Sequence, residues 1–218
     1  MILDEAVLST PPVADPCVDI ARELAEVGWT MTDDFLPSEL IQQLARETEI
    51  LWRSHRFRHA GTGRAERFRI DPTVRNDHVK WLDPGLLTDA QRAYLDQLET
   101  LRLSINRTLF LGLIELELHL SVYPPGSFYR KHLDQFRGTG QREVTTVLYL
   151  NERWQATDGG QLRIYTDPEA EDGYQDILPL GGRLVTFLSA RFLHEVLPAR
   201  RKRMSITGWF KRRGETWH

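Results

Sequence analysis

Cysteine is the scarcest residue type in this sequence. The chain has 218 residues and a single cysteine, Cys17. One cysteine excludes an internal disulfide framework and is too few for a cysteine-based zinc or iron–sulfur site. The sequence is therefore typical of a reducing compartment, and a metal site in it would need other ligands.

Long apolar runs and an excess of one charge are also missing. No hydrophobic stretch approaches the roughly 20 residues that cross a membrane, and the first residues are acidic where a signal peptide is basic. The formal charge of −3 gives no overall attraction to nucleic acid. We see no internal repeat and no long edge strand. We therefore expect one domain over residues 1–218, cytoplasmic and monomeric, without a membrane partner.

The N-terminal half is predicted to be helical. Residues 1–14 have the composition of a loose tail, and residues 15–112 form a helical support. Capping residues and helical spacing predict three helices, from Pro16 to Gly28, from Pro37 to about Trp52 and from Thr88 to Gly112. The buried face of the second helix is predicted to contain Leu40, Ile41, Leu44 and Ile50. Two short strands are expected at 29–32 and 78–82.

The segment 53–76 breaks this pattern. It is rich in glycine and polar residues, and it contains seven arginines: Arg53, Arg56, Arg58, Arg64, Arg67, Arg69 and Arg75. Long loops within a domain are usually functional lids or disordered insertions. Both a basic flap that covers a substrate and a solvated excursion remain open.

The C-terminal part, residues 113–213, has the period of β-strands. Apolar residues alternate with polar ones from Leu113 to the turn after Val122. Further strands are predicted at 144–150, 161–165, 183–188 and 204–210, separated by Gly, Asp and Pro. This spacing predicts a β-barrel or double-sheet roll, covered by the N-terminal helices.

The most informative stretch is YPPGSFYRKHLD, residues 123–134. In an extended segment His132 and Asp134 point to the same side, since alternate residues share a face, while Leu133 points away into packing. Two histidines and one carboxylate are the ligands of non-haem Fe(II) sites that leave coordination positions open. His194 is the natural third ligand of a site built on His132 and Asp134.

The last strand adds an arginine to this site. Arg203, Ser205, Thr207 and Trp209 share one face of it. If that face looks inward, Arg203 is buried and needs a carboxylate, which a diacid cosubstrate supplies. Tyr149 is placed to donate a second hydrogen bond to the same carboxylate.

Several motifs in this order resemble the Fe(II)- and 2-oxoglutarate-dependent prolyl hydroxylases, in particular bacterial members similar to the hydroxylases of hypoxia-inducible factor. The resemblance runs from about Gly28 to Arg213 and includes YPPGSFYRKHLD, VLYLN (147–151), DGGQLRIY (158–165), HEVLPA (194–199) and RMSITGWF (203–210). It implies a double-stranded β-helix, or jelly roll, beneath N-terminal helices. It also implies Fe(II), 2-oxoglutarate and O₂ as cofactor and cosubstrates, with ascorbate as a candidate accessory reductant.

The resemblance assigns roles to individual residues. His132, Asp134 and His194 would bind iron, and Arg203 with Tyr149 would bind the distal carboxylate of 2-oxoglutarate. Tyr123 and Thr207 are the other candidate cosubstrate contacts. The substrate entrance would contain Asp77, Tyr129, Arg142 and Trp209. Asp77 belongs to RNDHVKW (75–81), where Asn76 replaces the family's glycine.

Three substrate classes remain open at this point. The resemblance favours a prolyl residue in a protein, such as a translation component like elongation factor Tu. A hydroxylase of a free amino acid or small peptide is the second reading. The basic segment motivates a third, a nucleic-acid demethylase or binding module, but the second arginine of the dealkylating relatives is replaced here by Trp209.

Overall fold

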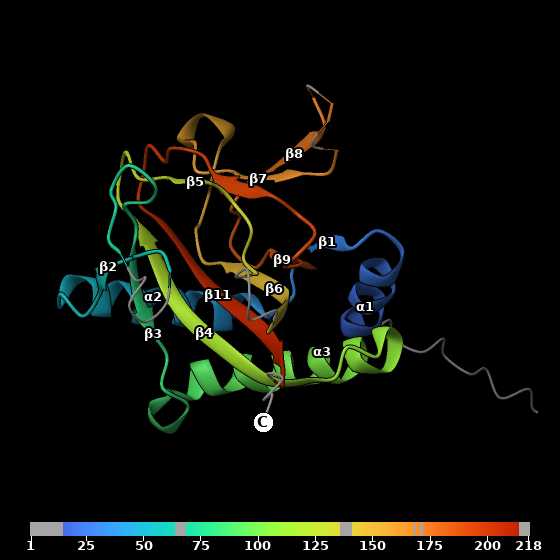
Figure 1. Cartoon of the computed structure of the whole chain (residues 1–218). Coiled ribbons are helices and arrows are strands. Elements are labelled where there is room, and N and C mark those ends of the chain that lie inside the picture. The colour runs from blue at the N-terminus through green and yellow to red at the C-terminus, as the bar shows by residue number, and fades with distance from the viewer. Residues whose placement is uncertain (1–14, 64–68, 136–140, 168, 171, 214–218) are drawn as a thin grey trace, which may run out of the picture.

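The computed structural model describes residues 15–63, 69–135, 141–167, 169–170 and 172–213. The predicted tail at 1–14 and Arg64 and Arg67 of the basic segment lie outside these ranges. Figure 1 shows the helices gathered against one side of the long strands β4 and β11, with a smaller sheet on the other side. The described helices include none that is long and apolar enough to cross a membrane.

Three α-helices cover the large sheet. They are α1 (Pro16–Glu26), α2 (Ser38–Arg53) and α3 (Asp89–Leu109). Asp15 caps α1 by accepting a hydrogen bond from the Cys17 N–H, and Thr88 and Gln91 form the predicted capping box of α3. Two 3₁₀ turns, η2 (Pro84–Leu86) and η3 (Ala156–Asp158), complete the helical elements that are described.

One expectation about α2 is wrong. Ile50 is 64% exposed, and Thr48 is buried instead beside Ile41 and Leu44. The Thr48 hydroxyl donates to the Leu44 carbonyl at 2.7 Å. Because this bond satisfies the hydroxyl within the helix, a polar residue occupies the buried face without leaving a free donor.

The strands form two sheets, and every strand pair is antiparallel. The large sheet has the order β1-β9-β6-β11-β4-β3-β2 and the small sheet the order β5-β10-β7-β8. The large sheet comprises β1 (Trp29–Thr32), β2 (Arg58–His59), β3 (His78–Trp81), β4 (Leu113–Tyr123), β6 (Arg142–Tyr149), β9 (Leu184–Leu188) and β11 (Arg203–Arg212). The small sheet comprises β5 (Tyr129–His132), β7 (Leu162–Tyr165), β8 (Tyr174–Ile177) and β10 (His194–Val196).

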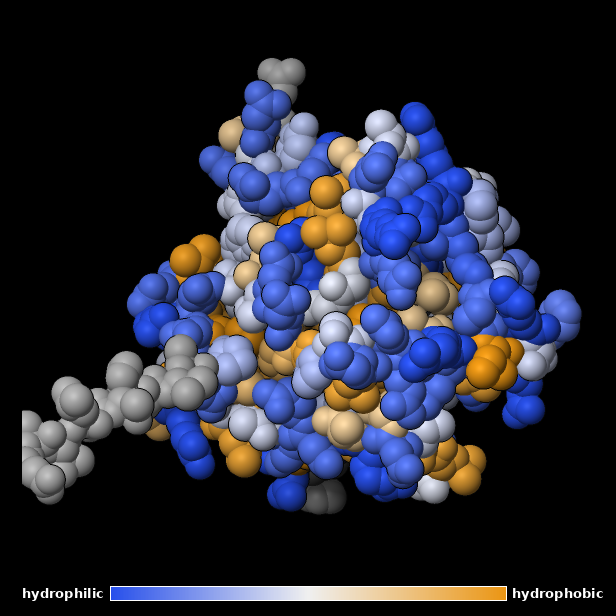
Figure 2. All heavy atoms as spheres, turned by 180° about the vertical axis from the view of Figure 1, so that it is seen from behind, coloured by the Kyte–Doolittle hydropathy of each residue, from blue (hydrophilic) through white to orange (hydrophobic). Residues whose placement is uncertain are grey.

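Two apolar cores separate the three layers. One core joins the helices to the outer face of the large sheet and includes Leu24, Leu98 and Phe210. The other lies between the two sheets and includes Tyr149, Ile164 and Phe187. Seen from behind, the surface is largely hydrophilic and broken by small apolar groups (Figure 2). The predicted double-sheet roll under helices is confirmed, and functional side chains project into the space between the sheets.

The described residues of segment 53–76 form more regular structure than a long loop would. Arg53 ends α2, Arg58 belongs to β2, and Thr62 pairs with Arg69 through an antiparallel bridge. Arg75 is not part of a solvated flap, because its side chain is 12% exposed and pairs with buried Asp77. Within this segment, β2 pairs with β3 at the edge of the large sheet, and the Thr62–Arg69 bridge lies beyond it.

Candidate metal centre

The predicted ligands meet in the small sheet. His132 ends β5 and His194 begins β10, and the two residues are direct partners in the antiparallel register. Asp134 follows His132 where the chain leaves the strand, and it is 8% exposed. Leu133 is 42% exposed, so the expectation that it packs inside is wrong. The strand ends at His132, so the side chain of Leu133 is not held in the alternation of the sheet. Leu133 lines the opening of the cavity that contains the three residues.

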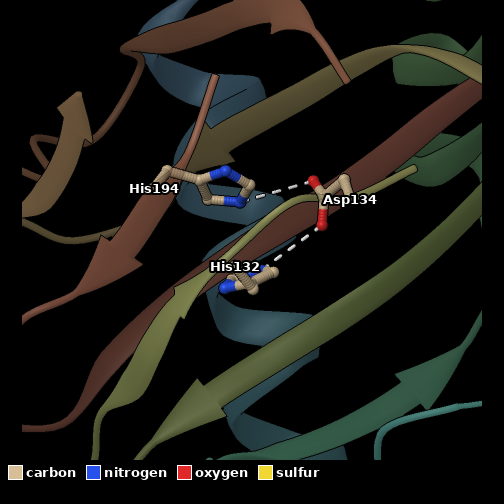
Figure 3. A group of neighbouring side chains, drawn as sticks. All are labelled: His132, Asp134 and His194. Carbon is tan, nitrogen blue, oxygen red and sulfur yellow. Dashed lines mark ion pairs between the residues drawn. The ribbon is translucent and has the colours of Figure 1, made fainter. Parts of the chain in front are cut away.

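The two imidazoles face one carboxylate (Figure 3). His132 Nε2 lies 3.4 Å from Asp134 Oδ1, and His194 Nε2 lies 3.5 Å from Asp134 Oδ2. One potential ligand atom from each residue lies within 4.8 Å of the other two. The three side chains thus form a compact donor set on adjacent strands.

Main-chain carbonyls orient both imidazoles. The Nδ1 atoms of His132 and His194 lie 2.7 Å from the Arg130 carbonyl and 3.1 Å from the Phe192 carbonyl. A carbonyl only accepts, so each Nδ1 carries the hydrogen and each Nε2 has a free lone pair. These lone pairs suit a metal ion placed beside Asp134.

Burial and charge set the protonation of the site. Burial, together with the charge of His132, lowers the pKa of His194 to about 4. Burial alone would raise the pKa of Asp134, but the adjacent imidazoles of His194 and His132 hold it well below its usual value. Near neutral pH His194 is therefore neutral and Asp134 is ionised, the forms that bind metal.

A buried arginine lies in the same cavity, which has a volume of about 540 Å³. Arg203 is 1% exposed and lies over the rings of Tyr123 and Tyr149, at 4.8 and 5.0 Å from their centroids. Its Nε donates to the Gly160 carbonyl at 2.9 Å, and its Nη1 to Ser205 Oγ at 3.4 Å. A guanidinium has five N–H donors, and no carboxylate in the described part of the chain forms an ion pair with Arg203.

A family model, the 2OG-Fe(II) oxygenase superfamily, matches residues 118–211. The crystal structure of a Pseudomonas putida prolyl-4-hydroxylase is 44% identical, superposes with a TM-score of 0.81, and covers 91% of this chain and 100% of its own. The chain belongs to the 2OG-Fe(II) oxygenase superfamily. Oxygenases of this superfamily use Fe(II) and 2-oxoglutarate with O₂.

Two further relatives resemble this oxygenase. The hypoxia-inducible factor prolyl hydroxylase of Caenorhabditis elegans is 34% identical over 207 residues, which are 90% of this chain and 28% of that protein. The prolyl hydroxylase of Trichoplax adhaerens, in complex with a hypoxia-inducible factor peptide, is 27% identical with a TM-score of 0.79 and covers 90% of this chain and 89% of its own. The oxygenase thus spans little more than a quarter of the nematode relative.

The residues in the cavity are suited to bind both Fe(II) and 2-oxoglutarate. Nitrogen and carboxylate donors with no thiolate suit Fe(II). Arg203 has N–H groups left over, and the buried Tyr149 hydroxyl has no hydrogen-bond partner among the described residues. These are the donors that a buried carboxylate of 2-oxoglutarate would satisfy.

The candidate entrance residues separate into two groups. Tyr129, Arg142 and Trp209 line the cavity of the oxygenase, as do Tyr123 and Thr207. The Arg142 guanidinium lies 3.7 Å from the centroid of the Trp209 ring. Asp77 does not line the cavity, because it is fully buried behind Arg75 and accepts two hydrogen bonds from it at 2.7 Å.

The Arg75–Asp77 pair supports a stack of rings that ends at the metal site. The Arg75 guanidinium lies 4.0 Å from the centroid of the Tyr129 ring, and Tyr129 stacks on His132 at 3.5 Å between centroids. Asp77 therefore affects the metal site only indirectly, through its contact with Arg75 and the contact of Arg75 with Tyr129. Its position in the sequence alone did not suggest this role.

Sequence reasoning also missed His119. It lines the cavity of the oxygenase between Trp81 and Trp209, with ring centroids 5.0 Å from each. The alternation of β4 was the available signal, but by itself it predicts only a strand with one apolar and one polar face. That polar face turns into the cavity.

Proposed function

We propose that this oxygenase hydroxylates a prolyl residue in a protein substrate. The observation that carries the proposal is the gradient of exposure along one cavity. Arg203 is 1% exposed, the ligands His194 and Asp134 are 4% and 8% exposed, and Leu133 is 42% exposed. A diacid bound at the buried end would leave the metal between itself and an open rim.

We propose these roles for the site residues. His132, Asp134 and His194 hold Fe(II), and Arg203 and Tyr149 hold the distal carboxylate of 2-oxoglutarate, while Tyr123 and Thr207 contact the remainder of the cosubstrate. When bound, Fe(II) and 2-oxoglutarate would supply the chemistry that oxidises an unactivated C–H bond with O₂. The protein's part is placement, since reactivity of this kind falls on the group held nearest.

The walls of the cavity mouth suit a peptide substrate. Tyr129 and Trp209 present aromatic rings, which would hold a prolyl ring and exclude water. The Arg142 guanidinium lies over the Trp209 ring and donates a hydrogen bond to Glu117 Oε2 at 3.1 Å. The nematode relative is named a hypoxia-inducible factor prolyl hydroxylase, and the Trichoplax structure contains a peptide fragment of a hypoxia-inducible factor.

Two alternative substrate classes are disfavoured by particular residues. A free amino acid needs a closed pocket, whereas Trp81 and Leu133 at the rim are 39% and 42% exposed. A nucleic-acid demethylase on this barrel would resemble its relatives in an arginine six residues after Arg203, where this chain has Trp209.

The test compares all proteins of a strain lacking this gene with those of its parent. Mass spectrometry should find one prolyl peptide that loses the mass of one oxygen atom in the deletion strain. Elongation factor Tu is the first protein to inspect. The wild-type gene should restore the hydroxylation, and Asp134→Ala should not. If no prolyl peptide changes, the substrate class is wrong.

A second arm tests cosubstrate binding. Replacing Arg203 removes charge-assisted hydrogen bonds worth about 1.5–3 kcal/mol, so Arg203→Ala should raise the 2-oxoglutarate KM at least about tenfold. Its Co(II) affinity should stay that of the wild type. An unchanged KM would contradict the role of Arg203. A cytoplasmic location, a monomeric state and stimulation by ascorbate belong to this proposal as well.

A further inference from the structure

Two buried hydroxyl groups lie behind the carboxylate of Asp134. Thr145 on β6 and Ser189 just after β9 are both 0% exposed. Thr145 Oγ1 donates to Asp134 Oδ2 at 2.9 Å, and the hydroxyl oxygens of Thr145 and Ser189 lie 2.8 Å apart. Neither residue is among those that line the cavity.

The direction of this chain of hydrogen bonds follows from donor counting. A metal-binding carboxylate is ionised and only accepts, while each hydroxyl has a single hydrogen to donate. The hydrogen of Thr145 therefore goes to Asp134. The hydrogen between the two hydroxyls must then come from Ser189.

The orientation of the Asp134 carboxylate needs these hydrogen bonds, because Asp134 lies beyond the end of β5. β5 ends at His132, and the terminal torsion of an aspartate side chain has a broad minimum. Ser189 also holds the backbone beside Asp134, since its carbonyl accepts from the Gln135 N–H at 3.3 Å. Its own N–H donates to the Glu143 carbonyl of β6 at 2.9 Å. Ser189 thus ties the ligand segment to the large sheet by side chain and main chain.

We propose that Thr145, oriented by Ser189, is a positioning residue that fixes the rotation of the Asp134 carboxylate for metal binding. The inference rests on the metal-binding part of the proposed function and is independent of the substrate. Groups that orient a metal ligand through a hydrogen bond typically change metal affinity 10–100-fold when removed.

Two substitutions of Thr145 separate its hydroxyl from its shape. Thr145→Val keeps the branched shape and removes the hydroxyl, whereas Thr145→Ser keeps the hydroxyl and removes a methyl group. Co(II) titration of the metal-free protein, followed by its visible absorption bands, should give a 10–100-fold weaker affinity for Thr145→Val. Thr145→Ser should bind with nearly the wild-type affinity and the wild-type spectrum. The reverse order would mean that Thr145 acts by packing and would overturn the proposal.

Thr146 provides the matched control. It is the next residue of β6, is also 0% exposed, and lies on the opposite face of the strand. Thr146→Val should leave Co(II) affinity unchanged, and an equal loss in both valine variants would contradict the proposal. If Thr145→Val does not fold, as judged by circular dichroism, Ser189→Ala replaces it. That variant lets the Thr145 hydroxyl turn away, so wild-type affinity and spectrum would overturn the inference.

The outcomes also separate this inference from the proposed function. Wild-type protein that binds Co(II), with His194→Ala binding far more weakly, supports the metal centre whatever its substrate. If those results hold and Thr145→Val binds like wild type, only the role of Thr145 fails. If the wild type does not bind Co(II), the metal centre and the role of Thr145 both fail.

Discussion

At the scale of single residues, His119 illustrates how surroundings set the charge of a side chain. It is 4% exposed and enclosed by two tryptophan rings. Burial lowers the pKa of its imidazole to about 3, and the positive charges of Arg75 and Arg142 act in the same direction, while Asp134 opposes them. The folded protein therefore keeps His119 neutral where the unfolded chain binds a proton.

This difference predicts a loss of stability in acid. Below the ordinary histidine pKa of about 6.5 the unfolded chain takes up a proton that the folded protein does not bind until about pH 3. Between pH 7 and pH 5 this one group should lower the free energy of unfolding by about 2 kcal/mol. In His119→Leu that part of the pH dependence should vanish, as measured by urea unfolding of the metal-free proteins. Identical pH dependence in the two proteins would contradict the assignment.

At the scale of elements, segment 73–77 fastens the edge of the large sheet to β5. Arg130 N–H donates to the Val74 carbonyl at 2.9 Å, and Phe128 N–H donates to Asn76 Oδ1 at 2.8 Å. The side chain of Asn76 thus accepts a main-chain hydrogen bond at this junction. The Arg75–Asp77 ion pair is buried within this segment.

Breaking this buried pair should be costly. Asp77→Asn leaves the Arg75 guanidinium in a buried site without a carboxylate, so the free energy of unfolding should fall by about 3–5 kcal/mol. Asp176→Asn is the matched control, because it removes a two-bond pair with Arg163 whose side chains are 23% and 34% exposed. Surface pairs contribute about 0–1 kcal/mol. Urea unfolding checks both, and equal losses would mean that burial of the Arg75 pair adds nothing.

The sequence predicted elements best where a local signal was strong. The capping box at Thr88 and Gln91 and the period-two alternation of β4 both mark elements that the structure contains. β8 and β10 were missed, since β10 has only three residues and β8, with the sequence YQDI, does not alternate between apolar and polar residues. Helix α3 ends at Leu109 rather than Gly112, because Phe110 adopts the left-handed conformation with φ 56°.

The candidate site was predictable where one short motif contained the chemistry. His132, Asp134, His194 and Arg203 come together in one cavity as expected. Thr145 and Ser189 were not found, because a threonine in an apolar strand and a serine in a turn carry no pattern of their own. Their relation to Asp134 exists only after β6, β9 and the end of β5 have been brought side by side. Asp77 was likewise assigned to the entrance because the sequence does not reveal its partner Arg75.

At the scale of the whole molecule, the helices and both sheets form successive layers around continuous cores. Leu24 of α1 is 1% exposed and belongs to the core that also contains Leu98 and Phe210. The metal centre lies on the far side of the large sheet from that core. The stability of the site should therefore depend on helix packing that never touches it.

A change in α1 tests this dependence and the prediction of a single domain. Leu24→Ala should lower the free energy of unfolding by about 2–5 kcal/mol, because it leaves a cavity. Val18→Ala on the exposed face of the same helix, where Val18 is 53% exposed, should change it by less than about 0.5 kcal/mol. Loss of helical circular dichroism should coincide with the change in tryptophan fluorescence. Two separate transitions would contradict a single domain.

Strand β11 also fixes the spacing of the residues that project from it into the cavity. Arg203, Thr207 and Trp209 lie on one face of it, and a strand advances about 3.4 Å per residue. From the arginine, Thr207 is thus about 14 Å along the strand and Trp209 about 20 Å. Because β4 and β6 pair with β11 on both sides, these intervals cannot stretch. Arg203 and Trp209 therefore keep a fixed spacing along the cavity wall, whatever occupies the space between them.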